Sequence, residues 1–156
     1  MSIPAPFLPP SGPVDVLLLE DSLADAEITM MALREMGLSR GVGLFRAALP
    51  ALDFLFCTGA FQHRIPDQPR LILLDGHLPD LEGLEVLRKV RAHIYTSRIP
   101  VVMISSAMSQ QELDQAYSHG ANACMAKPAS MDPYCQVIKR TAAYWLDRQL
   151  VLATVG

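Results

Sequence analysis

Five short runs of consecutive apolar residues, separated by segments with helical periodicity, constrain the fold of this chain more than any other feature. The runs occupy residues 14–19, 42–47, 71–74, 101–104 and 123–126. Four or more apolar residues in succession are typical of strands that are buried on both faces, as in a parallel sheet, so helices must cover both sides. The repeated β-α order therefore predicts an α/β fold with a doubly wound five-stranded parallel sheet in a single domain.

The segments between the runs carry helix signals. Ser22 precedes an apolar repeat at helical spacing, which comprises Ala24, Ile28, Met31, Ala32 and Met36. Ser109 and Glu112 form an S-x-x-E capping box. Asp132 before Pro133 predicts an N-cap followed by the first residue of a helix, which we expect to extend past Leu150.

Proline placement divides the chain. Five of the twelve prolines fall within the first thirteen residues, where fixed φ angles and missing N–H donors oppose helix and sheet. We therefore expect a Pro-rich tail at residues 1–13, a compact domain at residues 14–148 and a C-terminal extension at residues 149–156.

Composition excludes several classes of protein. Apolar residues make up 51% of the chain, which excludes a disordered polymer. The net charge of −3, with 13 basic residues, argues against a nucleic-acid surface. No apolar run reaches the roughly 18–20 residues needed to span a bilayer. The three cysteines include no C-x-x-C pair, which favours a reducing compartment. We expect a cytoplasmic protein that binds neither nucleic acid nor membrane.

Charged and polar residues directly follow four of the predicted strands. They are Glu20 and Asp21 after the first run, Asp75 and His77 after the third, Ser105 after the fourth and Lys127 after the fifth. Ligands of doubly wound sheets bind beyond the carboxyl ends of the strands, so these side chains should meet at one rim. Clustered carboxylates repel one another and need a counterion, and a set of hard oxygen ligands favours Mg²⁺.

Such a rim supports phosphoryl transfer onto a carboxylate. Asp75 ends what should be the central strand and is the expected acceptor. Lys127 and the metal can offset the incoming negative charge, and the Ser105 hydroxyl can donate to a phosphoryl oxygen.

Four segments carry a family resemblance: LLLEDS, LILLDGHLPDLEG, IPVVMISSA and GANACMAKP. In this order and spacing the chain resembles the receiver domain of two-component response regulators, the CheY-like superfamily. The resemblance implies a flavodoxin-like fold, dependence on Mg²⁺, and phosphorylation of Asp75 by a histidine kinase or phosphotransfer protein. It also implies that Asp21 and Asp75 bind the metal directly, that Glu20 acts largely through water, and that the main-chain carbonyl of His77 completes the protein ligands.

The resemblance implies two further features, and the chain departs from the family pattern at one position. The Lys127–Pro128 peptide bond should be cis, and Gly83 should be the residue without a Cβ that permits the turn after the acceptor strand. Cys124 departs from the pattern, because receivers commonly carry an aromatic residue three positions before the lysine.

The segments EDSLADAEI, CTGAFQHRIPDQPR and AYWL are also similar to the stand-alone receivers that are paired with phytochrome-type histidine kinases. A bacteriophytochrome would then be the partner. The short remainder after Leu146 predicts output through protein contact, and we expect a homodimer through the C-terminal helix face and the apolar residues 149–155.

Three other functions stay open at this point. A pseudo-receiver would bind a partner without phosphorylation, and a phosphoryl sink would have no dedicated output. An aspartyl-phosphate hydrolase of the haloacid dehalogenase type uses similar chemistry, but it needs a D-x-D motif after an early strand, where this chain has EDS. We therefore do not expect an enzyme.

Overall fold

The computed structural model describes residues 10–155, with the backbone alone for residues 148–155. Most of the predicted N-terminal tail and the side chains of the predicted C-terminal contact lie outside the described residues. The boundaries predicted for the tail and the extension stay predictions.

The chain forms one five-stranded parallel sheet in the order β2-β1-β3-β4-β5. The strands are β1 (Val16–Leu19), β2 (Val42–Phe45), β3 (Leu71–Asp75), β4 (Val101–Ser105) and β5 (Ala123–Ala126). Every predicted strand is present, and β3 is the central one. The predicted doubly wound α/β fold is confirmed.

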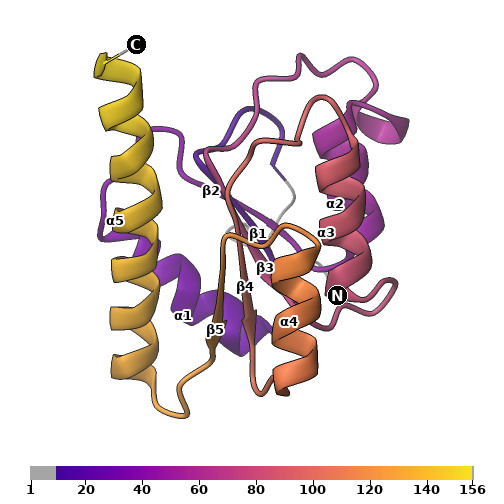
Figure 1. Cartoon of the computed structure of the whole chain (residues 1–156). Coiled ribbons are helices and arrows are strands. Elements are labelled where there is room, and N and C mark those ends of the chain that lie inside the picture. The colour runs from indigo at the N-terminus through magenta and orange to yellow at the C-terminus, as the bar shows by residue number, and fades with distance from the viewer. Residues whose placement is uncertain (1–9, 156) are drawn as a thin grey trace.

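Helices cover both faces of the sheet (Figure 1). They are α1 (Leu23–Arg34), α2 (Ala48–Phe56), the 3₁₀ helix η2 (Gly59–Phe61), α3 (Gly83–Ala92), α4 (Gln110–Ser118) and α5 (Met131–Val155). The first and last helices pack on one face, and α2, α3 and α4 pack on the other. No helix within residues 10–155 combines the length and the apolar character needed to cross a membrane.

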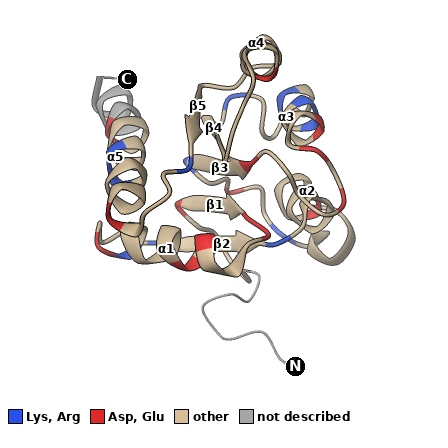
Figure 2. Cartoon of the chain, turned by 90° about the horizontal axis from the view of Figure 1, so that it is seen from below, with Lys and Arg blue, Asp and Glu red and all other residues tan. Residues whose placement is uncertain are grey.

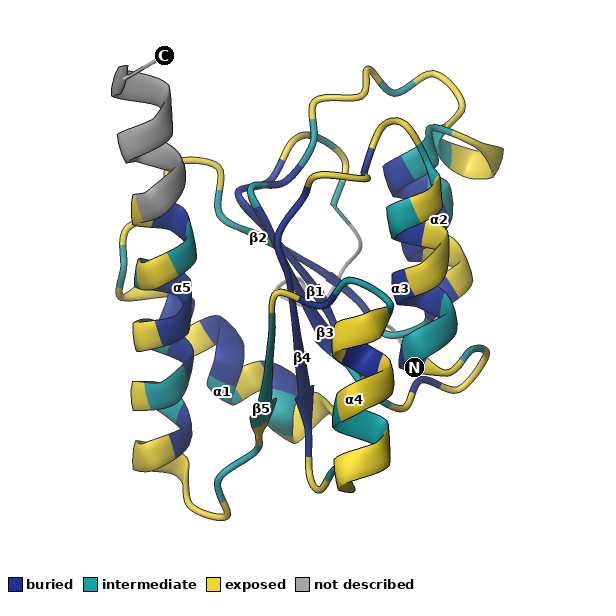
Figure 3. Ribbon diagram, in the orientation of Figure 1, coloured by how far each residue is buried: buried dark blue, intermediate teal, exposed yellow. Residues whose placement is uncertain are grey.

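Each inner strand contributes to two hydrophobic cores. In β1, Leu17 and Leu19 face the core beneath α2, α3 and α4, whereas Val16 and Leu18 face the core beneath α1 and α5. All four residues are buried (Figure 3). The edge strand β5 is only half-buried over Ala123–Met125, since one of its sides has no neighbouring strand. Burial on both faces explains why the apolar runs are continuous instead of alternating.

The predicted apolar repeat of α1 is confirmed in part, since Ala32 is buried and Ile28 and Met36 pack against the core. The buried residues of this helix are Ala26, Thr29, Met30, Ala32 and Leu33, whereas Ala24 and Met31 are exposed. The buried face includes a polar residue, Thr29, whose hydroxyl donates to the carbonyl oxygen of Asp25 at 2.9 Å. This bond satisfies the hydroxyl, so Thr29 can be buried. A search for apolar residues alone does not find this position.

Helix starts follow the sequence signals at two of three positions. Ser22 accepts a hydrogen bond from the Asp25 N–H, and Ser109 accepts one from the Glu112 N–H, as N-caps do. The N-cap predicted at Asp132 was wrong, since α5 begins at Met131 and the Tyr134 N–H donates to the carbonyl of Ser130. Asp132 nevertheless lies in the first turn, where a carboxylate interacts favourably with the helix dipole.

Candidate functional site

The carboxyl ends of the strands bring the predicted side chains to one edge of the sheet. Glu20 directly follows β1, Asp75 and Ser105 end β3 and β4, and Lys127 directly follows β5. Seen from this side, the acidic segments at the ends of β1 and β3 and at the start of α1 lie near one another (Figure 2). The neighbouring positions of β1 and β3 in the sheet, paired through Leu19 and Leu74, fix this arrangement.

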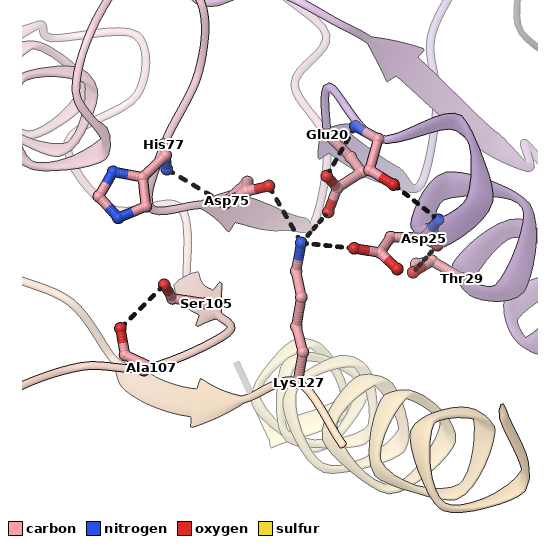
Figure 4. Close-up of polar contacts among 9 residues, drawn as sticks. Glu20, Asp25, Thr29, Asp75, His77, Ser105, Ala107 and Lys127 are labelled. Atoms are coloured by element: carbon pink, nitrogen blue, oxygen red, sulfur yellow. Dashed lines mark hydrogen bonds and ion pairs between the residues drawn. The ribbon is translucent and has the colours of Figure 1, made fainter. Parts of the chain in front are cut away.

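Lys127 lies at the centre of the cluster (Figure 4). Its Nζ is 2.8 Å from Glu20 Oε2, 2.9 Å from Asp25 Oδ2 and 3.1 Å from Asp75 Oδ2. The side chain is only 9% exposed. Burial disfavours the ammonium, but the hydrogen bonds to Glu20 and Asp25 outweigh burial and hold the pKa of Lys127 above its usual value. Lys127 is therefore a permanent cation at this site.

The predicted cis bond between Lys127 and Pro128 was wrong, since none of the described peptide bonds is cis. The backbone of Lys127 is held by its N–H, which donates to the Ser105 carbonyl at 2.8 Å. From this backbone position the lysine side chain reaches the carboxylates of Glu20, Asp25 and Asp75.

Glu20 and Asp75 share the Lys127 ammonium. The Glu20 side chain is 3% exposed. Burial and then the hydrogen bond to Asp75 raise the pKa of Glu20 to about 7. Burial also acts against ionisation of Asp75, but hydrogen bonds from Glu20, the His77 N–H and Lys127 outweigh it and lower the pKa of Asp75. Glu20 therefore holds a proton near neutral pH. The two carboxyl groups have one ammonium, that of Lys127, to balance their charge.

Asp75 is fixed from the loop that follows it. Its Oδ1 accepts from the His77 N–H at 3.1 Å, and the exposed His77 ring places Nδ1 3.1 Å from Glu82 Oε2. Gly83 packs against the same loop, where a Cβ would lie 2.9 Å from the carbonyl oxygen of Asp75 and 2.9 Å from the Cα of Gly76. The glycine is thus needed for a close approach of the backbone, and its φ angle is not positive.

Ser105 contributes its backbone to the Lys127 cluster, but its hydroxyl bonds elsewhere. The Oγ donates to the carbonyl of Ala107 at 3.3 Å, in the loop between β4 and α4. The Ser105 hydroxyl is thus bonded to the loop between β4 and α4. It would have to break this bond to turn toward a group on Asp75.

Asp21 lies outside the Lys127 cluster. Its side chain is 54% exposed, its Oδ1 is 4.0 Å from Arg46 Nη2, and the same guanidinium donates to its carbonyl at 3.2 Å. Within the described part of the chain, no three His, Cys, Asp or Glu side chains are arranged to hold a metal. The predicted ligand set of Glu20, Asp21, Asp75 and His77 is therefore not assembled around a cation and stays a prediction. Its donors still suit Mg²⁺, because Glu20 and Asp75 are adjacent, oxygen-bearing and short of positive charge.

Asp25 is a site residue that the sequence interpretation missed. It is the third residue of α1, three positions after the N-cap Ser22, and it bonds both through its N–H to Ser22 and through its carboxylate to Lys127. The signal was its place in the first turn, since that turn starts beside the end of β1. Position in the turn alone, however, does not specify the partner of the side chain.

At Cys124, where the family pattern has an aromatic residue, the neighbouring helix supplies one. The phenol oxygen of Tyr117 on α4 accepts from the Cys124 N–H at 3.1 Å. The bond satisfies a donor of the edge strand β5.

The response regulator receiver domain family model matches residues 16–139, most of the chain. Among curated relatives, the probable methanogenesis regulatory protein FilR2 of Methanothrix harundinacea is 31% identical over 134 residues, covering 86% of this chain and 84% of FilR2. Response regulator Rcp1 of Synechocystis sp. strain PCC 6803 is 27% identical over 135 residues, covering 86% of this chain and 90% of Rcp1.

The same likeness holds for solved structures. The Mn²⁺-bound form of Rcp1 superposes with a TM-score of 0.77, covering 84% of this chain and 93% of that one. The phosphorylated cyanobacterial phytochrome response regulator RcpA superposes with a TM-score of 0.78 at 29% identity, covering 84% of this chain and 92% of RcpA.

Proposed function

The chain belongs to the response regulator receiver domain family, and from this premise we propose that it accepts a phosphoryl group on Asp75 from a histidine kinase or a phosphotransfer protein. The observation that carries the proposal is the pairing of the Asp75 carboxylate with a buried ammonium, Lys127, at the carboxyl end of the central strand. RcpA, which is similar over most of both chains, has a solved phosphorylated form.

The reaction moves phosphorus from nitrogen to oxygen. A carboxylate oxygen of Asp75 attacks the phosphorus of a phosphohistidine, the P–N bond breaks, and the imidazole leaves with the electron pair and takes up a proton. Lys127 offsets negative charge on the phosphoryl oxygens. Ser105 exchanges its bond to the Ala107 carbonyl for a bond to one of these oxygens. The main contributions of the protein are positioning and charge neutralisation.

We propose that Glu20, Asp21, Asp75 and the main-chain carbonyl of His77 hold a divalent cation, Mg²⁺ in the working protein. The relative Rcp1 has a solved Mn²⁺-bound form. A bound Mg²⁺ supplies further neutralisation of phosphoryl charge. Glu20 must lose its proton to bind the cation, and its raised pKa means that it keeps this proton up to about pH 7. Metal binding should therefore strengthen as the pH rises from about 6 to about 8.

We further propose that the protein is a stand-alone receiver in a phytochrome pathway, with a bacteriophytochrome-type kinase as its partner. The support is the match to nearly the whole of Rcp1 and RcpA, the latter described as a phytochrome response regulator. FilR2 is named for a different process, so the kinase needs a direct comparison. Purified phytochrome kinases should phosphorylate the protein faster than unrelated histidine kinases do; equal rates would overturn the pairing.

Output through protein contact completes the proposal. Exposed aromatic and apolar side chains on α4 and α5 favour a homodimer through this face; they are Tyr117, Met131 and Tyr144. The protein would act in the cytoplasm without contact to nucleic acid or membrane, and it would receive phosphoryl groups stoichiometrically instead of turning over a substrate. Light scattering that gives a monomer mass at every concentration, with and without a phosphoryl mimic, would remove the dimer.

The decisive test is phosphorylation itself. Acetyl phosphate with Mg²⁺ should give a shifted band on Phos-tag gels for the wild type and none for Asp75→Asn. Asp132→Asn, an exposed carboxylate in the first turn of α5, is the matched control and should shift like the wild type. An unshifted wild type would instead favour a pseudo-receiver, and release of phosphate from added phosphoesters would favour a hydrolase.

A further inference from the structure

We propose that Asp25 is a positioning residue that holds the Lys127 ammonium in the unphosphorylated protein and competes with the incoming phosphoryl group for it. The inference rests on the proposed phosphorylation of Asp75. It assigns a role to a carboxylate on α1 that lies outside the set of residues predicted to bind metal or phosphoryl groups.

The hydrogen-bond capacity of the ammonium sets up the competition. A lysine ammonium has three N–H donors and no acceptor. In this structure three carboxylates surround it, at 2.8 Å for Glu20, 2.9 Å for Asp25 and 3.1 Å for Asp75. The contacts with Asp25 and Asp75 are hydrogen bonds and the contact with Glu20 is an ion pair, so three carboxylate oxygens surround the nitrogen. A phosphoryl oxygen can therefore approach Lys127 closely only if one of these partners moves away.

The exposure of the three carboxylates identifies the partner that is released. The side chains of Glu20 and Asp75 are 3% and 11% exposed, whereas Asp25 is 30% exposed. A buried carboxylate that loses its cation also loses hydration, whereas a partly exposed one regains water. Asp25 also lies in the first turn of α1, where the helix dipole favours a negative charge. Asp75 itself loses its carboxylate charge when it becomes an acyl phosphate, so of the other two partners of the ammonium, Asp25 is the less costly to release.

Two effects of the Asp25 charge then act in the same direction. It holds a donor that the phosphoryl group needs, and it repels the roughly −1.5 to −2 charge that phosphorylation brings. Both favour the unphosphorylated state. The contact therefore raises the threshold for phosphorylation, and its removal should ease binding of a phosphoryl group.

The test measures binding of beryllofluoride, a phosphoryl mimic, in the presence of Mg²⁺ by fluorine NMR. Asp25→Asn keeps the shape and an acceptor oxygen but removes the charge, and it should bind the mimic roughly 2- to 5-fold more tightly, as loss of a partly exposed ion pair implies. Asp25→Glu keeps the charge and should stay within about 2-fold of the wild type on the same grounds. Glu27→Gln removes an exposed carboxylate from the same helix and should leave the affinity unchanged.

A separate readout follows the contact without the mimic. The Lys127 ammonium protons, observed by NMR in the protein free of mimic, should exchange with water faster in Asp25→Asn than in the wild type or Glu27→Gln. Unchanged exchange would show that Asp25 does not hold the ammonium. A merely structural role would make Asp25→Glu as disruptive as Asp25→Asn.

The outcomes separate this inference from the proposed function. If neither the wild type nor Asp25→Asn binds beryllofluoride, phosphorylation at Asp75 fails and the inference falls with it. If the wild type binds but Asp25→Asn binds equally or more weakly, the proposed function stands and the competition by Asp25 is refuted.

Discussion

Two cations at opposite ends of the parallel sheet, Lys127 and Arg91, bind different kinds of partner. At the carboxyl end, Glu20, Asp25 and Asp75 share one ammonium. At the other end, the Arg91 guanidinium binds neutral acceptors on the segments that lead into β4 and β5. It donates to the carbonyls of Ile99 at 2.7 Å and Gly120 at 2.9 Å, and to the side-chain oxygen of Asn122 at 2.7 Å.

The difference separates stability from function. Around Arg91, donors of the guanidinium bond to acceptors of the protein itself, so this end of the sheet needs no ion or ligand. Around Lys127, carboxylates outnumber cations, and burial together with the neighbouring Asp75 raises the pKa of Glu20 to about 7. An end of the sheet that remains short of positive charge is suited to a metal and a phosphoryl group.

Removal of Arg91 should give the largest change in stability. Arg91→Met removes hydrogen bonds to part-buried and exposed acceptors, and we expect a loss of about 3 kcal/mol in the free energy of unfolding, since a hydrogen bond to a charged group contributes about 1.5–3 kcal/mol and water replaces part of it at an exposed acceptor. Urea denaturation measures this loss, and Phos-tag gels should show that phosphorylation of the folded variant persists. Arg88→Met, which breaks only the exposed pair with Glu85 on the same helix, should cost less than about 0.5 kcal/mol. A stable Arg91→Met protein that accepts no phosphoryl group would contradict the division between the two ends.

The pH dependence of stability tests the carboxyl end. The pKa of Glu20 is about 7 in the folded protein, against an ordinary value of 4.5 that applies to the unfolded chain. Between these two pH values the folded state therefore binds more protons than the unfolded state. Stability should therefore fall as pH rises through this window, by roughly 1–3 kcal/mol for the metal-free protein, since each pH unit of difference is worth about 1.4 kcal/mol.

Urea titrations at pH 5 and pH 8 in the presence of a chelator measure this change. Glu20→Gln should flatten the profile, and added Mg²⁺ should reduce the loss at pH 8. Stability that rises between pH 5 and pH 8 in the wild type would show that Glu20 does not retain its proton.

Asp80 sharpens the comparison, because it lies at the functional end but is fully bonded. Its carboxylate accepts from the N–H groups of Ala48 at 2.7 Å and Leu49 at 2.8 Å, and so caps α2, whose N-cap residue Ala47 has no side-chain acceptor. Asp80→Ala should lower the free energy of unfolding by about 1 kcal/mol, as loss of a helix cap does. Binding of beryllofluoride by the folded variant should change little.

The cap should also depend on pH. Burial acts against ionisation of Asp80, but the hydrogen bonds from backbone N–H groups, among them those of Leu49 and Ala48, together outweigh it and lower the pKa of Asp80. The contribution of Asp80 is therefore complete above its ordinary pKa and is lost as pH falls through the lowered value. The difference in stability between the wild type and Asp80→Ala should shrink in acid, and a constant difference would argue against the cap.

Sequence alone predicted the features that depend on short stretches of chain. Continuous apolar runs predicted all five strands. Because ligands of doubly wound sheets bind beyond the carboxyl ends of the strands, the sequence also predicted that Glu20, Asp75 and Lys127 lie close together. The same rule placed Asp21 with them, but its side chain lies beside Arg46.

Features that depend on contacts between distant segments could not be predicted in this way. Asp80 caps a helix that begins 32 residues earlier in the chain, and no local pattern connects the two. Asp25 meets Lys127 across 102 residues. Cys57 ends α2 in the left-handed conformation with φ of 58°, which is uncommon for a residue other than glycine and has no signal in the local sequence.

The close packing at Gly83 limits how this protein can change over evolutionary time. A single added carbon there would press on the backbone of Asp75, on the backbone of Gly76 and on the Met103 side chain, each at 2.9 Å. Relatives that diverge freely on nearby surfaces should keep glycine at this position, and a library of random variants selected for signalling should recover almost no other amino acid there.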